Sequence, residues 1–239
     1  VASVPLANLL GLRGLLALTS VLGVLGMVLV LTTPGGKAQP VIVEPHSAGS
    51  AKPLWLLALS VFLLHTVMTL LFVVLPGLLV GRHAFALAEH WKLYFPTMVA
   101  SVLLMLPVLR WMGARKAERV ILPWAFGLLG IALILLAQGF SIAWMAGLMI
   151  VYFLGFNLLE AAMPSLVARV AGSTDRGRKM GLYSTFQFLG AFAGGLGGGL
   201  LLAHFGGAFA LALAGCICLV WGACAVWFTQ SFFPTSQPH

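Results

Sequence analysis

Two side chains, His65 and Glu160, combine proton chemistry with a position inside long apolar runs of the sequence. The other four acidic residues stand in polar stretches or near the ends of such runs. An ionisable group is costly to place in hydrocarbon, so one that stands there is a candidate for function. An imidazole exchanges protons in the physiological pH range, and a carboxyl in a low-dielectric site can load and release a proton. The pair therefore indicates proton transfer.

Each of these residues also has a structural interpretation. His65 stands about eleven residues into its run and could simply hydrogen-bond to a neighbouring helix. Glu160 stands six residues before the expected end of its helix. It could pair with Arg115 or Arg119, or with the start of the next helix, where the helix dipole favours an anion. The sequence leaves both interpretations open.

Polar and aromatic residues recur near these positions at the spacing of one helix face. The candidate cavity residues are Phe62, Thr69 and Phe72 around His65; Tyr152, Phe153, Phe156 and Asn157 before Glu160; and Tyr183, Phe186 and Gln187 in the next run. Such a stripe either packs against other helices or lines a cavity. We predict that His65 and Gln187 face one central cavity, because exposing either to lipid would be costly. A lining of Phe and Tyr with few amides suits amphipathic organic molecules of moderate size.

The elements that must position these residues are membrane-spanning helices. Of the 239 residues, 61% are hydrophobic and 8% are charged, and the mean hydropathy is +1.08. A soluble domain of this length could not cover its core with so few charges. Apolar runs that can cross about 30 Å of hydrocarbon occur at 11–33, 54–79, 91–112, 119–139, 141–166, 179–203 and 207–229. They are continuous rather than alternating, which predicts an all-α membrane protein with seven transmembrane helices instead of a barrel.

Three glycines stand at four-residue spacing in the sixth run: Gly190, Gly194 and Gly198. Small residues at this spacing lie on one face of a helix and let two membrane helices approach closely. We therefore predict that these glycines form a helix-packing face.

The basic residues predict the orientation of the chain. Of the 13 lysines and arginines, four lie in or beside 110–119 and four in 169–179, whereas the loops near 140 and 205 carry none. Basic loops stay on the cytoplasmic side, which predicts that loops 34–53, 110–119 and 167–178 and the C-terminus are cytoplasmic. The basic loops are expected to contact anionic membrane lipid. Nucleic acid is not an expected partner, since the sequence shows no basic surface interleaved with aromatic residues outside the runs.

Residue sets for enzymatic chemistry are missing from the sequence, and we expect neither enzymatic activity nor a cofactor. The three cysteines, Cys216, Cys218 and Cys224, all stand in the last apolar run with no histidine or carboxylate near them in sequence. Cys216 and Cys218 point to different faces of a helix, so a metal site is not expected. We interpret these cysteines as buried free thiols.

Four segments resemble a known transporter family. They are LHTVMTLLFVVLPG (64–77), EHWKLYFPTM (89–98), FNLLEAAMPSLVARVAG (156–172) and MGLYSTFQFLGAFAGG (180–195). Together they resemble the major facilitator superfamily, and within it the YajR-type, drug-efflux-like proton antiporters. The resemblance implies proton-coupled efflux of small amphipathic organic compounds across a bacterial inner (plasma) membrane.

The resemblance also implies an organisation of the chain. Residues 1–33 correspond to helix six, 34–53 to a cytoplasmic linker, 54–229 to the six-helix C-terminal bundle and 230–239 to a short cytoplasmic tail. The sequence contains no segment that corresponds to the first five helices of such a transporter. The sequence is therefore expected to be a piece of a longer transporter, with the missing N-terminal half as its partner.

One loop departs from the family pattern. Residues 110–119 resemble the end of the facilitator gating loop, but Arg110 stands where an acid is expected. The basic part is kept by Gly113, Arg115, Lys116 and Arg119. These residues either gate the cytoplasmic side or only anchor the topology through lipid contact.

A second function from another class stays open at this stage. Seven apolar runs are also compatible with a non-transporting membrane protein, such as a receptor or an assembly factor. The discriminating feature is the sequence upstream of Val1, where a transporter would have five more spans and a complete acidic gating loop.

Overall fold

The computed structural model describes residues 3–32, 51–114, 118–171 and 175–232, and no strand occurs in these ranges. Its elements are α1 (Ser3–Thr32), α2 (Ala51–His83), the short 3-10 helix η1 (Leu87–Glu89), α3 (Trp91–Ala114), α4 (Glu118–Ala137), α5 (Ile142–Ala171), α6 (Arg176–Phe205) and α7 (Gly207–Phe232). Seven helices in these ranges are long and apolar enough to cross a membrane. The predicted all-α membrane fold with seven transmembrane helices is thereby confirmed. Most of the predicted linker 34–53 and of the tail 230–239 lies outside the described residues.

Some predicted helix ends need correction, and one of them affects the site. The fifth run was expected to end at 166, but α5 continues to Ala171. The extra residues include Val170 and Arg169, which continue the backbone hydrogen bonding beyond the apolar part of the run. Glu160 therefore lies eleven residues before the end of its helix, not six. At a rise of about 1.5 Å per residue this is roughly 16 Å from the helix end.

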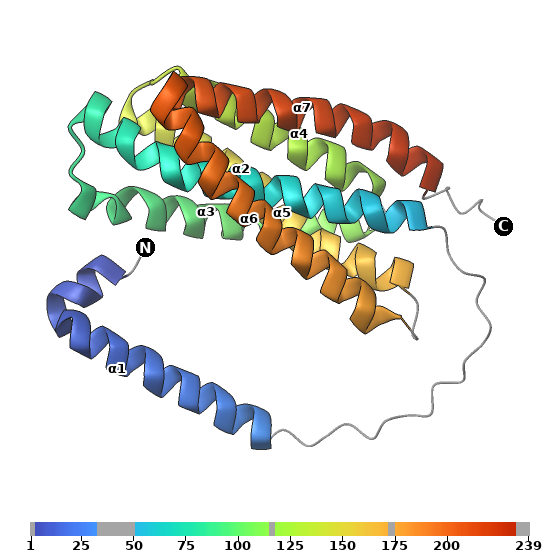
Figure 1. Ribbon diagram of the computed structural model, residues 1–239, viewed down its shortest axis with the longest axis horizontal. Helices are drawn as coiled ribbons and strands as arrows, with labels where there is room; N and C mark the ends of the chain where they lie inside the picture. Colours follow the sequence, from blue (N-terminus) through green and yellow to red (C-terminus); the bar gives the residue numbers. More distant parts are fainter. Residues whose placement is uncertain (1–2, 33–50, 115–117, 172–174, 233–239) are drawn as a thin grey trace.

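The bundle is built on two extensive helix pairs, α2 with α6 and α4 with α7, joined through α5 (Figure 1). α5 also packs against α3 and α4. The apolar windows of α2 and α4 are each 56% buried, compared with 17% for α6, so α2 and α4 lie at the centre. α1 lies apart from the bundle in Figure 1, and its apolar window has no buried share.

Large apolar side chains fill the space between the central helices. Leu57, Leu64 and Leu71 of α2 are fully buried at helical spacing, as are Phe126 of α4 and Tyr152 of α5. These residues belong to one continuous apolar cluster. In a membrane such packing, rather than escape from water, holds the helices together.

The predicted glycine face packs against α2. A methyl group built on Gly190 would fall onto the Phe62 carbonyl oxygen, and one on Gly194 would fall onto the Thr66 carbonyl oxygen. One turn further, a Cβ on Gly198 would lie 3.1 Å from the Leu70 Cα atom. The Thr66 hydroxyl donates to the Gly190 carbonyl oxygen at 3.1 Å and to that of Phe62 at 2.8 Å. The two backbones are thus in direct contact along more than two turns.

A second close helix contact joins α4 to α7. A Cβ on Gly130 would lie 2.8 Å from the Gly215 carbonyl oxygen, and one on Gly215 would lie 2.7 Å from the Gly130 carbonyl oxygen. The sequence analysis did not single out these glycines, because each stands alone rather than in a spaced series. The pair brings the two backbones together much as the glycines of α6 do against α2.

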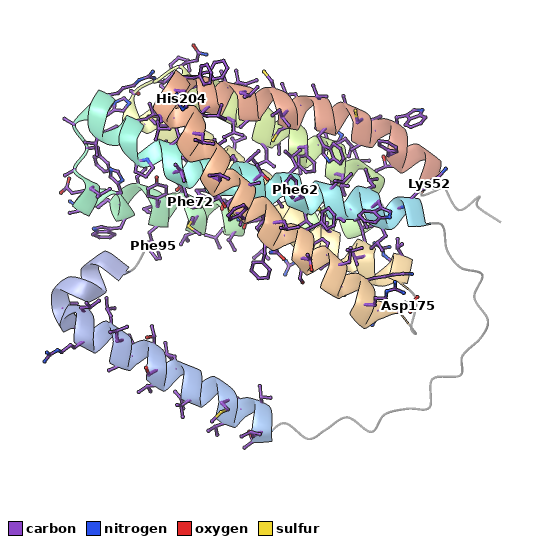
Figure 2. The ribbon with its side chains drawn as sticks, viewed as in Figure 1. Lys52, Phe62, Phe72, Phe95, Asp175 and His204 are labelled. Atoms are coloured by element: carbon purple, nitrogen blue, oxygen red, sulfur yellow. The ribbon has the colours of Figure 1, made fainter. Side chains whose placement is uncertain are left out.

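The helix ends that flank the three predicted cytoplasmic loops lie at the same end of the bundle. Figure 2 shows Lys52 and Asp175 toward this end and His204 toward the other. At the opposite end, Arg82 donates through Nη1 to the Ala137 carbonyl oxygen at 3.1 Å, where α4 ends. Gly139 follows with φ +74°, and a side chain there would collide with Arg82. Which end is cytoplasmic stays a prediction.

Candidate functional site

Three polar side chains from three helices meet in the bundle: His65 of α2, Glu160 of α5 and Gln187 of α6. The Nε2 atom of His65 lies 2.9 Å from the Nε2 atom of Gln187 and 3.5 Å from the Oε1 atom of Glu160. His65 is close to the middle of α2, which runs from residue 51 to 83. The two candidate proton carriers are therefore neighbours, with an amide beside them.

The hydrogen bonds of the imidazole define its neutral form. The Nδ1 atom of His65 lies 3.1 Å from the Val61 carbonyl oxygen one turn back. A carbonyl oxygen only accepts, so the ring donates through Nδ1. In the neutral ring Nε2 is then the acceptor and receives an N–H from Gln187. Any proton that His65 gains must bind at Nε2, the atom that also faces Glu160.

The carboxyl group of Glu160 lacks a hydrogen-bond donor among the described residues. Its Oε1 atom is buried and accepts no hydrogen bond from them, although it lies within ion-pair distance of His65. The side chain as a whole is 32% exposed, whereas that of His65 is only 8% exposed. A buried carboxylate oxygen without a hydrogen-bond donor is unfavourable. A proton held between Glu160 and His65 would supply that donor.

One aromatic ring packs against this polar group, and other rings pack together on the same helices. The Phe156 ring lies edge-on to the imidazole of His65, with centroids 5.9 Å apart. Phe186 contacts Phe62 at 6.5 Å and Trp55 at 5.6 Å, both edge-on. The Phe156 ring covers one edge of the imidazole. Apolar surroundings of this kind lower the local dielectric constant, which strengthens the interaction between charges.

Other candidate cavity residues have contacts of their own. Phe72 lies 5.8 Å from Tyr94 and 6.2 Å from Phe153, ring centre to ring centre, and forms an aromatic group further along α2. The methyl group of Thr69 faces α6, 3.6 Å from a Cβ built on Gly195. These contacts lie one to two turns from His65, so Thr69 and Phe72 are not brought into the polar group itself.

The candidates on α5 and α6 also have contacts of their own, although Tyr183 lies within electrostatic range of Glu160. Asn157 donates through Nδ2 to the Ser101 hydroxyl of α3 at 3.0 Å, which directs its amide toward α3. Tyr152 is fully buried, and its ring packs edge-on against Phe153 at 5.5 Å. Tyr183 is buried too, and its hydroxyl makes no hydrogen bond to a described residue. Whether these side chains line a cavity stays a prediction.

Three polar contacts between helices were missed by the sequence analysis. They are the Ser101 hydroxyl that Asn157 reaches, the Thr66 hydroxyl on the Gly190 carbonyl oxygen, and the Ser60 hydroxyl that accepts from Trp221 Nε1 at 3.0 Å. Small hydroxyl residues in apolar runs are common and satisfy themselves on their own helix. No sequence signal separates those that cross to a neighbour.

The predicted gating loop cannot be placed in the same detail. Arg115 and Lys116 lie outside the described residues, as does the side chain of Arg119. The alternative pairing of Glu160 with Arg115 or Arg119 therefore also lies outside them. Among the described residues, Glu160 lies within ion-pair distance of His65 and within electrostatic range of Tyr183.

The helices and the buried polar group define a polytopic integral membrane protein, and comparison with known proteins defines its class. Residues 57–238 match the family model of the Major Facilitator Superfamily. The chain is 31% identical over 206 residues to the inner membrane transport protein YajR of Escherichia coli (strain K12), which covers 85% of this chain and 42% of YajR. It is 28% identical over 137 residues to an uncharacterized transporter of Buchnera aphidicola subsp. Acyrthosiphon pisum (strain APS), covering 57% of this chain and 35% of that protein.

The chain therefore belongs to the Major Facilitator Superfamily, as the resemblance of its segments implied. It spans less than half the length of the curated relatives that it matches.

Proposed function

We propose that this chain is the C-terminal part of a secondary transporter that exports small amphipathic organic compounds in exchange for protons. The observation that supports this most is the contact between His65 and Glu160, inside helices of a Major Facilitator Superfamily member. Ionisable groups are rare within membrane helices and mark pathways for protons or substrates. Two of them within ion-pair distance are suited to share a proton.

The proton step follows from the hydrogen bonds of His65. A proton that arrives binds Nε2, because Nδ1 already donates to the Val61 carbonyl oxygen. The ring then carries a positive charge and donates from Nε2 toward Glu160, which gains the donor that its Oε1 atom lacks. Gln187, which donated to the neutral ring, must turn its amide so that its oxygen faces the new N–H. Loss of the proton reverses these changes.

The partly exposed side chain of Glu160 gives the proton a way in. Its exposure of 32% contrasts with 8% for His65, so Glu160 is the member of the pair that meets the surroundings. In a facilitator, substrate and proton sites lie between two halves that rock against each other. The rest of a longer protein would alternately cover and uncover this face. His65 and Glu160 are then the coupling residues of this half.

The substrate class rests on the aromatic residues near the polar group. Phe62, Phe156 and Phe186 offer apolar contact area next to one amide and one ionisable pair. A site with this balance binds molecules that are mainly apolar with a few polar groups. YajR, a relative, is described as an inner membrane transport protein, and we assign this chain to a bacterial inner membrane on that likeness.

The organisation of the chain is part of the proposal. We assign residues 1–33 to the sixth helix of the whole transporter and 54–229 to its C-terminal six-helix bundle, with 34–53 as the cytoplasmic linker. The loops 110–119 and 167–178 are then cytoplasmic, and the basic residues of 110–119 form the cytoplasmic gating loop of this half. The non-transporting alternative, a receptor or assembly factor, is not favoured by the family to which the chain belongs.

The test is proton exchange by the full-length protein in reconstituted vesicles. A pH-sensitive dye inside the vesicles reports proton movement when each of a panel of amphipathic dyes is added outside. A dye whose uptake moves protons in the opposite direction supports the proposal. Transport of such dyes that neither moves protons nor responds to an imposed pH gradient would overturn the coupling, and leave only facilitated transport.

A further inference from the structure

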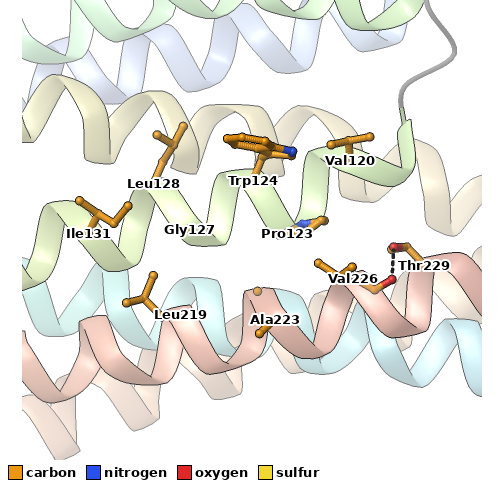
Figure 3. Close-up of a pocket in the computed structure, with 11 residues that line it drawn as sticks. Val120, Pro123, Trp124, Gly127, Leu128, Ile131, Leu219, Ala223, Val226 and Thr229 are labelled. Atoms are coloured by element: carbon orange, nitrogen blue, oxygen red, sulfur yellow. Dashed lines mark hydrogen bonds between the residues drawn. The ribbon is translucent and has the colours of Figure 1, made fainter.

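A groove runs along the outer face of α4 and α7, away from the polar group of His65. It has a volume of about 630 Å³. Its walls come from α4, including Val120, Trp124 and Ile131, and from α7, including Leu219 and Val226. Figure 3 shows these side chains on either side of the groove. None of the candidate cavity residues contributes to it.

Two glycines explain why the groove exists. At Gly222, α7 approaches α4 closely, since a Cβ there would lie 3.1 Å from the Pro123 carbonyl oxygen. At Gly127, by contrast, nothing lies within 4 Å of a Cβ. The helices therefore touch at the floor of the groove, and the missing side chain of Gly127 leaves the space above it open.

The lining of the groove suits hydrocarbon. Apart from the Trp124 indole, the polar side chain in the lining is Thr229. Its hydroxyl donates to the Ala225 carbonyl oxygen at 2.7 Å and to that of Val226 at 3.2 Å, so it is satisfied within α7 (Figure 3). From Val120 to Ile131 the groove follows α4 for about 16 Å, at about 1.5 Å per residue. This length is close to half of a hydrocarbon core of about 30 Å.

A second apolar cavity lies beside the first and shares Trp124 with it. Its volume is about 370 Å³, and its other walls come from Val108 and Trp111 of α3 and Leu158 of α5. The Trp124 side chain is 68% exposed and stands between the two cavities. The two cavities also share Val120 and Leu128. Two neighbouring apolar sites on either side of one row of α4 side chains could take the two chains of a single diacyl lipid.

The end of the groove where these helices meet is basic. Arg110 is exposed and precedes Trp111, which lines the second cavity. A basic residue at the membrane surface attracts anionic lipid by about 1 kcal/mol. Arg110 therefore stands beside the second cavity, near the helix end where a headgroup would be if the acyl chains lay in the cavities.

We propose that one anionic diacyl phospholipid binds at this site, with an acyl chain on each side of Trp124 and its phosphate near Arg110. The proposal is separate from proton coupling, since the site shares no residue with the polar group. The bound lipid would belong to one leaflet and hold a defined position, unlike the exchanging lipid that surrounds any membrane protein.

Native mass spectrometry of the purified full-length protein tests the proposal, with phosphatidylglycerol and phosphatidylcholine added as competing probes. We expect one phosphatidylglycerol to stay bound in preference to phosphatidylcholine. Gly127→Leu should abolish this retention, because the new side chain fills the groove. Gly147→Leu is the matched control: Gly147 is also free of neighbours within 4 Å but lies on α5 outside the groove. Arg110→Gln should lower the preference about fivefold, which corresponds to about 1 kcal/mol.

A second measurement does not depend on a substitution in the groove floor. Trp124 and Trp144 are equally exposed, at 68%, but only Trp124 stands at the site. The protein is placed in phosphatidylcholine bilayers that contain a small fraction of chain-brominated phosphatidylglycerol, which quenches nearby tryptophans. The contribution of each tryptophan is the difference in fluorescence between the wild-type protein and Trp124→Phe or Trp144→Phe. The contribution of Trp124 should be quenched several-fold more than that of Trp144. Equal quenching of the two, or equal retention of the two lipids by the wild-type protein, would overturn the proposal. The second outcome is also the one expected if another part of the full protein covers the groove.

Discussion

The Nε2 atom of His65 lies 3.5 Å from the Oε1 atom of Glu160, across the contact between α2 and α5. The carboxylate oxygen has no other described donor, and the imidazole nitrogen is the one that remains able to take a proton. The two groups therefore respond to each other: charging either changes the free energy of charging its neighbour.

The first prediction concerns the carboxyl group. Glu160→Gln in the full-length protein keeps the shape and hydrogen-bonding capacity of the side chain but removes its charge and titration. We expect a folded protein that still exchanges substrate across vesicles but no longer responds to a pH gradient. The matched control is Glu89→Gln, which removes an acid whose exposed partner is Lys92, at 2.6 Å. Undiminished gradient dependence in folded Glu160→Gln would leave a structural role for this residue. Lower stability or expression, with the remaining activity still driven by the gradient, would do the same.

The second prediction concerns the amide beside the imidazole. Gln187→Leu removes the donor to His65 Nε2, and we expect it to lower the free energy of unfolding by about 1 kcal/mol and to weaken gradient-driven transport. Gln138→Leu provides the comparison, because Gln138 is exposed and reaches only its own helix, with a long contact of 3.5 Å to the Ile134 carbonyl oxygen. Thermal unfolding in detergent and vesicle transport measure the two effects. Equal behaviour of the two variants would contradict a role for Gln187.

The third prediction tests the contact between α2 and α6. Gly194→Ala places a methyl group on the Thr66 backbone, which cannot move aside as a flexible side chain would. We expect a loss of about 1–3 kcal/mol in stability, typical of overpacking. Gly197→Ala is the control on the same helix, since nothing lies within 4 Å of its Cβ. A thermal shift of the same size in both variants would show that helix propensity, rather than packing, dominates.

The fourth prediction tests the orientation of the chain. In a background with Cys216, Cys218 and Cys224 replaced by alanine, a cysteine at Ser173 should react with an impermeant thiol reagent only after the cells are permeabilised. A cysteine at Ser141, at the opposite end of α5, should react in intact cells. The reason is that basic loops stay cytoplasmic. Labelling of Ser173→Cys from outside would reverse the proposed topology.

Much of the fold could be predicted because membrane helices leave long apolar runs. The positions of the runs follow from the thickness of the hydrocarbon core. The helix ends are less well predicted, since hydropathy indicates which residues lie in the hydrocarbon and not where the helical backbone stops. At the end of α5, Arg169 and Val170 continue the helix past the apolar part. A long basic side chain can extend toward the headgroups from such a position.

The candidate site could be predicted only as separate residues. His65, Glu160 and Gln187 each stand out as polar groups in apolar runs, but their contact depends on how three helices pack. The contact of Gly130 with Gly215 depends on packing in the same way. Sequence spacing defines one face of one helix, and it contains no information on which face of another helix lies opposite.

The glycine contact between α6 and α2 also sets the axial position of Gln187 relative to His65. Gln187 precedes Gly190 by one turn, and His65 precedes Thr66 by one residue, so the Thr66 bond to the Gly190 carbonyl oxygen and the Gln187 bond to His65 are made at nearly the same level. An axial displacement of α6 along α2 would therefore change both contacts together. Protonation of His65, which requires Gln187 to turn, is thereby mechanically linked to the register of two helices.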